Sequence, residues 1–153
     1  MPGLVKEFEY YVDFGGIDEV GPGPFGRRII LNSAGGQFTG DRLNGTITGA
    51  GADWLLVGQD GFGRLDSRVT FTTDDGAVIY AQYFGLVELT PGIMDILGGG
   101  DTPTNFGDQY FFTNPRLETG DERYSWVNQT LFIGEGRVIP ARVEYRVYRV
   151  ANC

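Results

Sequence analysis

Glycine residues divide this chain into short segments that are rich in valine, isoleucine, threonine, tyrosine and phenylalanine. These residue types favour strands, and there is little sign of the 3.6-residue apolar stripe of an amphipathic helix. We therefore predict an all-β protein. The predicted strands span residues 4–13, 26–34, 36–48, 53–58, 62–74, 77–89, 109–114, 123–133 and 138–150.

Short turns such as Gln59–Gly61 and Asp74–Gly76 join most of these strands. Connections of this length make neighbouring strands antiparallel. The length of 153 residues fits a single domain, 1–153, folded either as a closed barrel or as two packed sheets. We favour one antiparallel β-barrel with a central ligand cavity, because closure removes exposed strand edges. An edge left open would favour a homodimer.

Two segments are too long to be simple turns, residues 15–23 and residues 91–108. Loops of this length usually carry function or are disordered. The second contains the apolar residues Ile93, Met94, Ile96 and Leu97 among five glycines. It is predicted to be a lid or a short helix over the mouth of the barrel, more mobile than the strands and in contact with the ligand; a surface insertion is the alternative.

Composition removes several classes of chemistry. The chain has no histidine, which excludes Ser-His-Asp and Cys-His catalysis and histidine-ligated metal sites. Its one cysteine, Cys153, permits no internal disulfide and no thiolate cluster. We predict neither a metal nor a cofactor. The reduced cysteine and an amino-terminal segment unlike a signal peptide predict a cytoplasmic protein.

The net charge is -8, which argues against a nucleic-acid partner and against acidic membranes. No apolar run approaches the length of about 20 residues that a membrane-spanning helix needs. Eleven of the twelve basic residues are arginines. Arginine offers a planar fork for carboxylates, phenolates or phosphates, although a bias in genome composition explains the excess equally well.

The segment 64–80 contains the most informative turn. Asp75-Gly76 is a preferred pair for a two-residue hairpin turn, which would place Arg68 opposite Tyr83 and Asp66 opposite Gly85. A polar stripe would then lie beside small residues, as in the lining of a ligand cavity. A three-residue turn would exchange the faces, and a solvated stripe is the other alternative.

Within such a cavity, Asp66 would lie between Arg64 and Arg68. Charge-assisted hydrogen bonds would keep its carboxyl group ionised and leave one guanidinium group free for an anionic oxygen of the ligand. The same spacing also fits an ordinary ladder of cross-strand ion pairs.

Asp53 follows a glycine-rich turn and opens a strand, so it is predicted at the rim of the sheet, as a catalytic carboxyl group or as a cap of the turn. Tyr124, Trp126 and Asn128 would share one strand face, and Trp126 would either pack in the core or contact the ligand. The candidate catalytic residues are Asp53, Asp66 and Arg68; the candidate ligand-binding residues are Arg42, Trp54, Arg64, Tyr83, Arg116, Glu118, Trp126 and Asn128.

Longer strings then carry a resemblance to a known family. These are the G-A-D-W turn that ends in Asp53 and Trp54, the L-D-x-R strand with Asp66 and Arg68, the T-D-D-G-A turn, and the P-R-x-E-T and Y-x-W-x-N strings. Together they resemble the bacterial and fungal domain of unknown function 3237 family over nearly the whole chain. The resemblance implies a small antiparallel β-barrel with a central cavity. Some similar fungal members act as cofactor-free cyclases in aromatic polyketide pathways, adding a hydroxyl group across an alkene.

Two functions follow as predictions. The first is a cofactor-independent cyclase or isomerase of an aromatic, polyketide-like molecule, with Asp53 or Asp66 as the acid and with Arg68 and Arg116 holding phenolate oxygens. Trp54, Tyr83 and Trp126 would line its cavity. The second is a barrel that binds a small aromatic or acidic ligand without chemistry. A binder returns its ligand unchanged, whereas a cyclase returns an isomer of equal mass.

Overall fold

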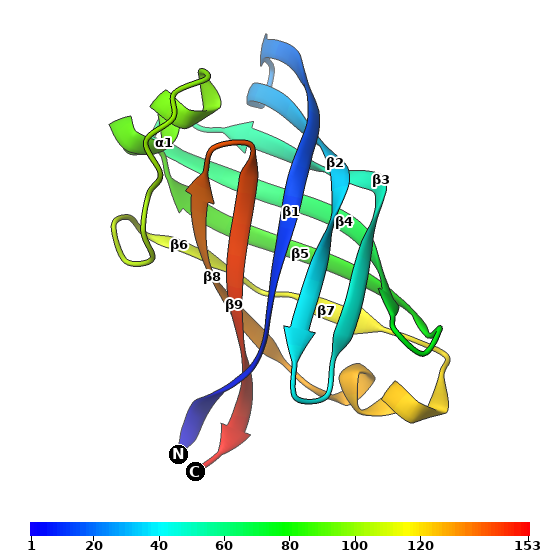
Figure 1. Cartoon of the computed structure of the whole chain (residues 1–153). Coiled ribbons are helices and arrows are strands. Elements are labelled where there is room, and N and C mark those ends of the chain that lie inside the picture. Colours follow the sequence, from blue (N-terminus) through cyan, green and yellow to red (C-terminus); the bar gives the residue numbers. More distant parts are fainter.

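The computed structural model describes residues 1–153 and is built almost entirely from strands (Figure 1). The all-β prediction is confirmed. The elements are β1 (Pro2–Gly23), β2 (Gly26–Gly40), β3 (Asn44–Val57), β4 (Phe62–Thr73), β5 (Val78–Glu88), α1 (Pro91–Leu97), β6 (Phe111–Thr113), β7 (Arg116–Glu118), the 3₁₀ segment η1 (Glu122–Gln129), β8 (Phe132–Ile139) and β9 (Arg142–Asn152). Neither helical segment is long and apolar enough to cross a membrane.

The strands form one antiparallel ring. β1 to β5 pair in sequence order, and the ring then continues through β6, β8 and β9 back to β1. β7 pairs with Tyr80–Gln82 of β5, which precede the residues of β5 that pair with β6. The predicted single β-barrel is therefore confirmed. The homodimer, which was argued from an open edge, stays a prediction.

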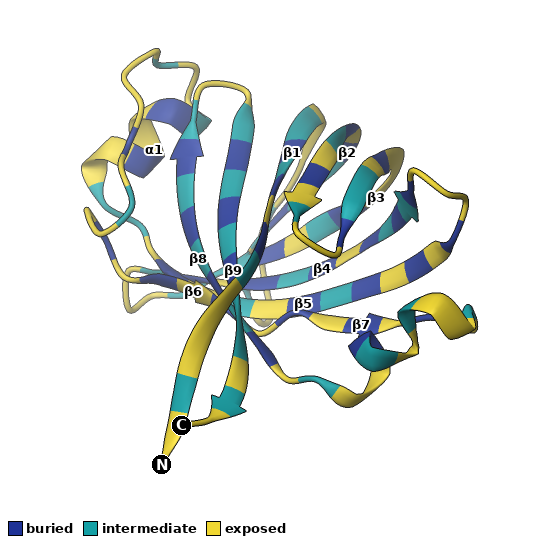
Figure 2. Ribbon diagram, turned by 60° about the horizontal axis from the view of Figure 1, so that its bottom comes forward, coloured by how far each residue is buried: buried dark blue, intermediate teal, exposed yellow.

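Alternation along the strands separates a buried inner face from an outer face, visible as colour bands in Figure 2. On β1, Phe8, Tyr10 and Val12 are buried, whereas Glu9 between them is exposed. The inward residues divide the interior into layers. At the end nearer the chain termini, four phenylalanines with 2% exposure or less fill the barrel. We call these four residues the phenylalanine plug: Phe8, Phe38, Phe71 and Phe132.

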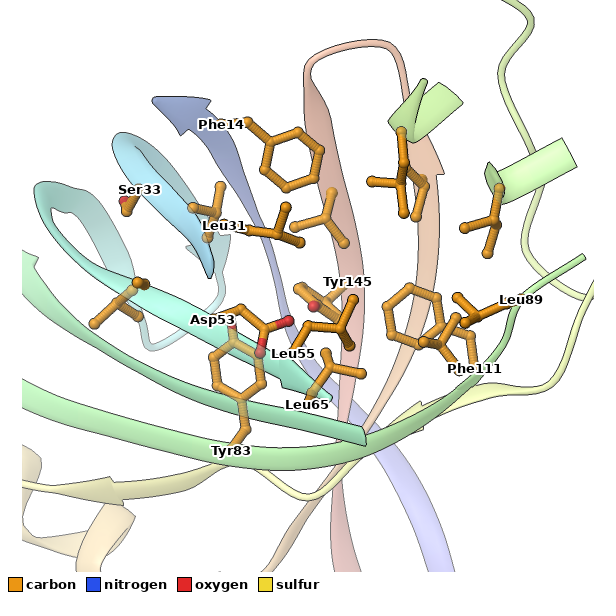
Figure 3. A pocket seen from close by; sticks show the side chains of 18 residues that line it. Phe14, Leu31, Ser33, Asp53, Leu55, Leu65, Tyr83, Leu89, Phe111 and Tyr145 are labelled. Carbon is orange, nitrogen blue, oxygen red and sulfur yellow. The ribbon is translucent and has the colours of Figure 1, made fainter. Parts of the chain in front are cut away.

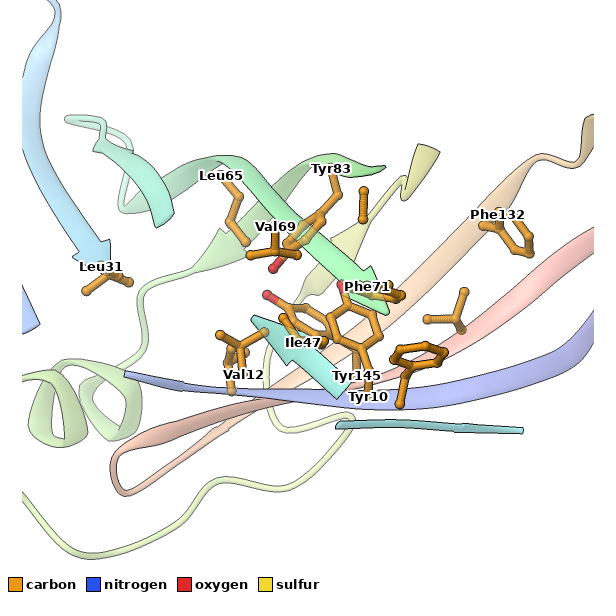
Figure 4. Packing of buried hydrophobic residues seen from close by; sticks show 14 of the residues in the cluster. Tyr10, Val12, Leu31, Ile47, Leu65, Val69, Phe71, Tyr83, Phe132 and Tyr145 are labelled. Carbon is orange, nitrogen blue, oxygen red and sulfur yellow. The ribbon is translucent and has the colours of Figure 1, made fainter. Parts of the chain in front are cut away.

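The plug is held by ring contacts between strands. The ring centroids of Phe38 and Phe71 lie 4.8 Å apart and are stacked, and Phe8 meets both Phe71 and Phe132 edge-on at 6.2 and 6.0 Å. Offset and edge-to-face pairs of this kind add to the stabilisation from apolar burial. Tyr10, Tyr83 and Tyr145 follow the plug as the next layer (Figure 4). A cavity lies beyond this layer.

Helix α1 lies at the end of the barrel opposite the chain termini (Figure 1). Thr90 caps the helix by accepting a hydrogen bond from the backbone N–H of Ile93, and Pro91 stands in its first turn. Ile93 and Ile96 are buried on the barrel side, so the prediction of a short helix over the mouth is confirmed. The greater mobility expected of this segment stays a prediction.

The segment that carries α1 is attached to the barrel on both sides. Before the helix, the Leu89 N–H donates to the Gly61 carbonyl at 2.9 Å. After it, Thr104 donates two hydrogen bonds to the Val138 carbonyl, from its backbone N–H at 3.0 Å and its hydroxyl at 2.7 Å. Phe106 then lies under two guanidinium groups, those of Arg137 and Arg146, at 4.7 and 4.1 Å.

Four sequence predictions about local structure were wrong. The predicted strands 26–34 and 36–48 are divided at another place, because β2 continues to Gly40 and β3 begins at Asn44. Residues 15–23 form no loop, because β1 continues through bulges and pairs with β2 as far as Gly23 opposite Gly26. The glycine-rich stretch 49–52 is a β-bulge region within β3 and not a turn. Most of residues 123–133 form η1 instead of a strand, because Asp121 caps this turn by accepting a hydrogen bond from the Arg123 N–H.

The register of the β4–β5 hairpin also differs from the predicted one. The turn has three residues, Asp74–Gly76, and Gly76 takes the positive φ of 93° that such a turn requires. The Thr73 hydroxyl accepts from the Ala77 N–H at 2.8 Å and donates to Asp75 at 2.6 Å, which stabilises the longer turn. This shift of one residue moves the whole polar stripe of β4 to the outer face.

Candidate functional site

The cavity lies between the tyrosine layer and α1, and measures about 50 Å³ (Figure 3). Because a cavity of about 10–15 Å³ holds one water, this one has room for a few waters or a small fragment. Sixteen of its eighteen lining residues are hydrophobic; the exceptions are Ser33 and Asp53. Ile93 and Leu97 of α1 contribute to the wall. The predicted central cavity is therefore present, and α1 covers part of it.

Strand register places Asp53 at the centre of the inner face. Leu31, Asp53, Ser67 and Tyr83 are direct cross-strand partners on β2, β3, β4 and β5, so they form one row across the sheet. The Asp66 backbone N–H donates to Asp53 Oδ1 at 3.0 Å and orients the carboxyl group. In Figure 3 this group points into the space in front of Tyr83 and Tyr145.

The environment of Asp53 changes its acidity. Burial among apolar side chains raises the pKa of this carboxyl group to about 7, because the charged form loses hydration. The hydrogen bond from the Asp66 N–H and the nearby Ser67 hydroxyl act in the opposite direction. The Ser67 hydroxyl faces the carboxyl group without the geometry of a hydrogen bond and has no partner. A carboxyl group with this pKa exchanges a proton near neutral pH.

Three buried tyrosines form the layer below the cavity, and two of them, Tyr83 and Tyr145, line its floor. Tyr10 and Tyr145 are direct partners on β1 and β9, with ring centroids 4.7 Å apart. Tyr83 approaches them from β5, at 6.0 Å from Tyr10 and 5.5 Å from Tyr145. Burial raises the pKa of all three phenols, that of Tyr83 to about 12. All three phenols therefore carry their protons at neutral pH and can donate hydrogen bonds.

Of the residues predicted from the sequence, the structure brings Asp53 and Tyr83 together in the cavity. Arg64 and Arg68 lie on the exposed outer face of β4, where Arg64 pairs with Asp60 at 2.6 Å. The side chain of Asp66 lies on the same outer face, with Oδ1 buried and unpartnered. The outward direction follows from the three-residue turn. The predicted ligand contacts of these three residues remain untested.

Arg42 and Trp126 meet at the opposite end of the barrel. The Arg42 guanidinium lies 3.6 Å from the Trp126 ring centroid. It also forms a salt bridge with the buried carboxylate of Glu7, and the Arg149 guanidinium lies 3.5 Å from the same carboxylate. These side chains line an open surface groove of about 770 Å³. The groove is separate from the cavity that holds Asp53, because the phenylalanine plug lies between them.

The remaining candidates also lie outside the cavity. Trp54 points outward from β3 and is 37% exposed. Arg116 and Glu118 are exposed on β7. Asn128 holds the neighbouring loop, since its amide group accepts from the Thr119 N–H at 2.9 Å and donates to the Thr119 carbonyl at 3.0 Å.

The sequence analysis missed Tyr10, Ser67 and Tyr145. A signal for both tyrosines was present. Phe8, Tyr10 and Val12 alternate with more polar residues, and Val143, Tyr145 and Val147 alternate with charged ones. Ser67 had no such signal. Its direction depends on the length of the β4–β5 turn, which the sequence left open.

Relatives of the chain share its fold over nearly their whole length. A UPF0311 protein from Rhodopseudomonas palustris is 34% identical over 82% of this chain and 81% of its own chain. A UPF0311 protein from Clostridium acetobutylicum is 27% identical over 82% of this chain and 79% of its own chain. The crystal structure of a conserved protein of unknown function from Rhodopseudomonas palustris has a TM-score of 0.90 at 28% identity and covers 99% of both chains.

Two further crystal structures extend the likeness. A β-barrel-like protein from Acinetobacter baumannii has a TM-score of 0.83 at 29% identity, covering 99% of this chain and 97% of its own. An enzyme from Penicillium herquei shares the fold, with a TM-score of 0.72 at 19% identity, over 98% and 95%. The model of the DUF3237 family, described as proteins of unknown function, matches residues 2–150. The chain therefore belongs to the DUF3237 family.

Proposed function

We propose that this protein is a cofactor-independent cyclase or isomerase that closes an oxygen heterocycle on a small aromatic, polyketide-like molecule. The supporting observation is the Asp53 carboxyl group, which has a pKa of about 7 and faces an apolar cavity. At neutral pH about half of the molecules carry a proton ready for transfer. The Penicillium herquei neighbour is described as an enzyme, but at its low identity it supports the fold alone.

The reaction is an intramolecular hydroalkoxylation. Protonated Asp53 gives its proton to one alkene carbon, the alkene π electrons form the new C–H bond, and a tertiary cation remains on the other carbon. A hydroxyl oxygen of the same molecule then forms the C–O bond and releases its proton to the Asp53 carboxylate. The product is an isomer of the substrate, and the acid is regenerated.

The cavity offers two further contributions to this step. The rings of Tyr83, Tyr145 and Phe111 line it, and aromatic faces stabilise a nearby cation. The buried side of α1 keeps water out, and a cation exposed to water would be hydrated instead of cyclised. The cavity of about 50 Å³ is smaller than a polyketide-like substrate, and an outward movement of α1, which contributes Ile93 and Leu97 to its wall, would enlarge it.

The test compares the two carboxyl groups that the sequence suggested as acids. Purified protein is incubated with an ortho-alkenyl phenol, and the products are separated by liquid chromatography and weighed by mass spectrometry. Asp53→Asn should reduce formation of the equal-mass isomer by about 10²–10⁴-fold, because an amide cannot supply the proton. Asp66→Asn should retain activity, since that side chain lies on the outer face. Parental turnover by Asp53→Asn would exclude this mechanism.

A barrel that binds a ligand without chemistry is the second candidate. It is favoured by the lining of the cavity, in which Asp53 is the one acidic or basic side chain and no second charged group assists a reaction. Such a protein would bind the same phenol and return it with an unchanged retention time.

A further inference from the structure

The floor of the cavity holds hydroxyl groups with unused hydrogen-bonding capacity. Ser67 is 1% exposed and Tyr10 is 3% exposed, and neither hydroxyl group has a partner with good hydrogen-bond geometry, although both lie close to the Tyr83 hydroxyl. Buried hydroxyl groups in folded proteins are almost always hydrogen-bonded, so unsatisfied ones require an explanation. These two lie beside Tyr83 and Tyr145, which line the cavity directly.

The same floor lacks any positive charge. No arginine or lysine is among the residues that line the cavity. Arg28 is close enough to influence Asp53, but its guanidinium group bonds the Trp54 carbonyl at 2.8 Å. A carboxylate or phosphate of a ligand would therefore lose its hydration and face the Asp53 carboxyl group without a counter-ion, which is unfavourable in an apolar enclosure.

Hydrogen-bonding capacity without positive charge suits an uncharged oxygen. We propose that the hydroxyl groups of Tyr83 and Tyr145, with Ser67 beside Tyr83 behind them, bind one neutral oxygen of the ligand, a phenol hydroxyl or a ketone carbonyl. The site would thereby select apolar molecules with one such polar end over carboxylates of the same skeleton. This inference deepens the proposed function and rests on it for the choice of site. It replaces the arginines suggested by the sequence with tyrosines as the groups that recognise the ligand oxygen.

Binding of three probes with one skeleton tests the selectivity. The probes are 4-propylphenol, propylbenzene and 4-propylbenzoate, and their affinities are measured by calorimetry at pH 6. A site built to hydrogen-bond an oxygen discriminates strongly against an analogue that lacks it. We expect the phenol to bind at least about tenfold more tightly than either other probe. Equal binding of the benzoate, or no measurable binding of the phenol, would overturn the proposal.

Single substitutions test the tyrosines. Tyr83→Phe and Tyr145→Phe each remove one oxygen and keep the ring, so each should weaken phenol binding by about tenfold and leave propylbenzene binding unchanged. Tyr80→Phe is the matched control on the same strand, because Tyr80 is 41% exposed on the outer face. Ser67→Ala provides a further variant should a tyrosine variant fail to fold. Full retention of the phenol preference in the folded variants would contradict the proposal.

The outcome separates this inference from the proposed function, because binding is measured without turnover. A protein that prefers the phenol and loses the preference in the tyrosine variants, but returns alkenyl phenols unchanged, would reject the cyclase and keep the inference. A protein that cyclises alkenyl phenols while Tyr83→Phe and Tyr145→Phe keep the parental phenol preference would support the cyclase and reject the inference.

Discussion

The two halves of the barrel interior are built by the same strands but are filled differently. Along the inner face of β4, Leu65, Ser67 and Val69 lie in the half that contains the cavity and the tyrosine floor, whereas Phe71 belongs to the phenylalanine plug. The plug leaves no space, and its rings contact one another across the barrel. One half thus stabilises the ring of strands, and this allows the other half to hold an ionisable group and unpaired hydroxyl groups.

The largest effect is expected from a cavity made in the plug. Phe71→Ala should lower the free energy of unfolding by about 3–5 kcal/mol, because it removes apolar contacts and leaves a void that the closed ring cannot fill. Denaturant unfolding measures this change. Phe112→Ala is the control, since Phe112 is 39% exposed and should cost far less. Equal losses in the two variants would show that the plug has no special role in stability.

The second prediction concerns Asp53 in the hollow half. Its pKa of about 7 in the folded protein lies above the ordinary value, so the folded state binds more protons than the unfolded state between about pH 4 and 7. Stability should therefore fall as the pH rises through this range, and the shift of about three pKa units corresponds to a loss of roughly 4 kcal/mol by pH 8. Asp53→Asn should remove this slope and be more stable than the parent at pH 8.

The chain suits this measurement because it has no histidine to titrate in the same range. Asp60→Asn serves as the control. Arg64 holds the pKa of the Asp60 carboxyl group at about 2, so its contribution to stability is lost only in acid. The control should keep the parental slope between pH 5 and 8. A parent whose stability is constant over that range would contradict the raised pKa of Asp53.

The smallest effect is expected from a pair of buried hydroxyl groups on the inner face of β4. Ser67→Ala should change the free energy of unfolding by less than about 1 kcal/mol, because its hydroxyl has no partner to lose. Thr73→Val should cost about 1–2 kcal/mol, because it leaves the Ala77 N–H without its acceptor. Denaturant unfolding of both variants gives the comparison. A larger loss for Ser67→Ala would mean that Ser67 is bonded in the folded protein.

The sequence predicted the barrel and the helix over its mouth, because strand-forming residues, short turns and one apolar loop segment are local signals. It did not predict which face of β4 points inward. That choice depended on the turn at Asp74–Gly76, where the Asp75-Gly76 pair favours two residues and the Thr73 hydroxyl stabilises three. One residue of register turned Arg64, Asp66 and Arg68 to the outer face and Ser67 to the inner face of β4.

Asp53 was chosen from the sequence because it carries a carboxyl group, and it lies in the cavity, but its neighbours differ from those predicted. Sequence spacing placed it at a rim beside a turn, whereas the bulged region of β3 carries it into the row between Leu31 and Ser67. Its partners Tyr10 and Tyr145 come from the two ends of the chain, and only closure of the ring brings them to Tyr83. Contacts of this kind depend on the complete barrel and have no local signal.

The two attachments of the α1 segment would restrict the outward movement of α1 that the proposed function includes. With Leu89 bound to Gly61 on one side, and Thr104 and Phe106 held on the other, outward movement of α1 leaves the helix tethered at both ends. Its return is an intramolecular event with a high effective concentration, set by the short tethers. Closure of α1 should therefore follow first-order kinetics that do not depend on protein concentration. The time during which a ligand can enter or leave would then be set by the α1 segment alone.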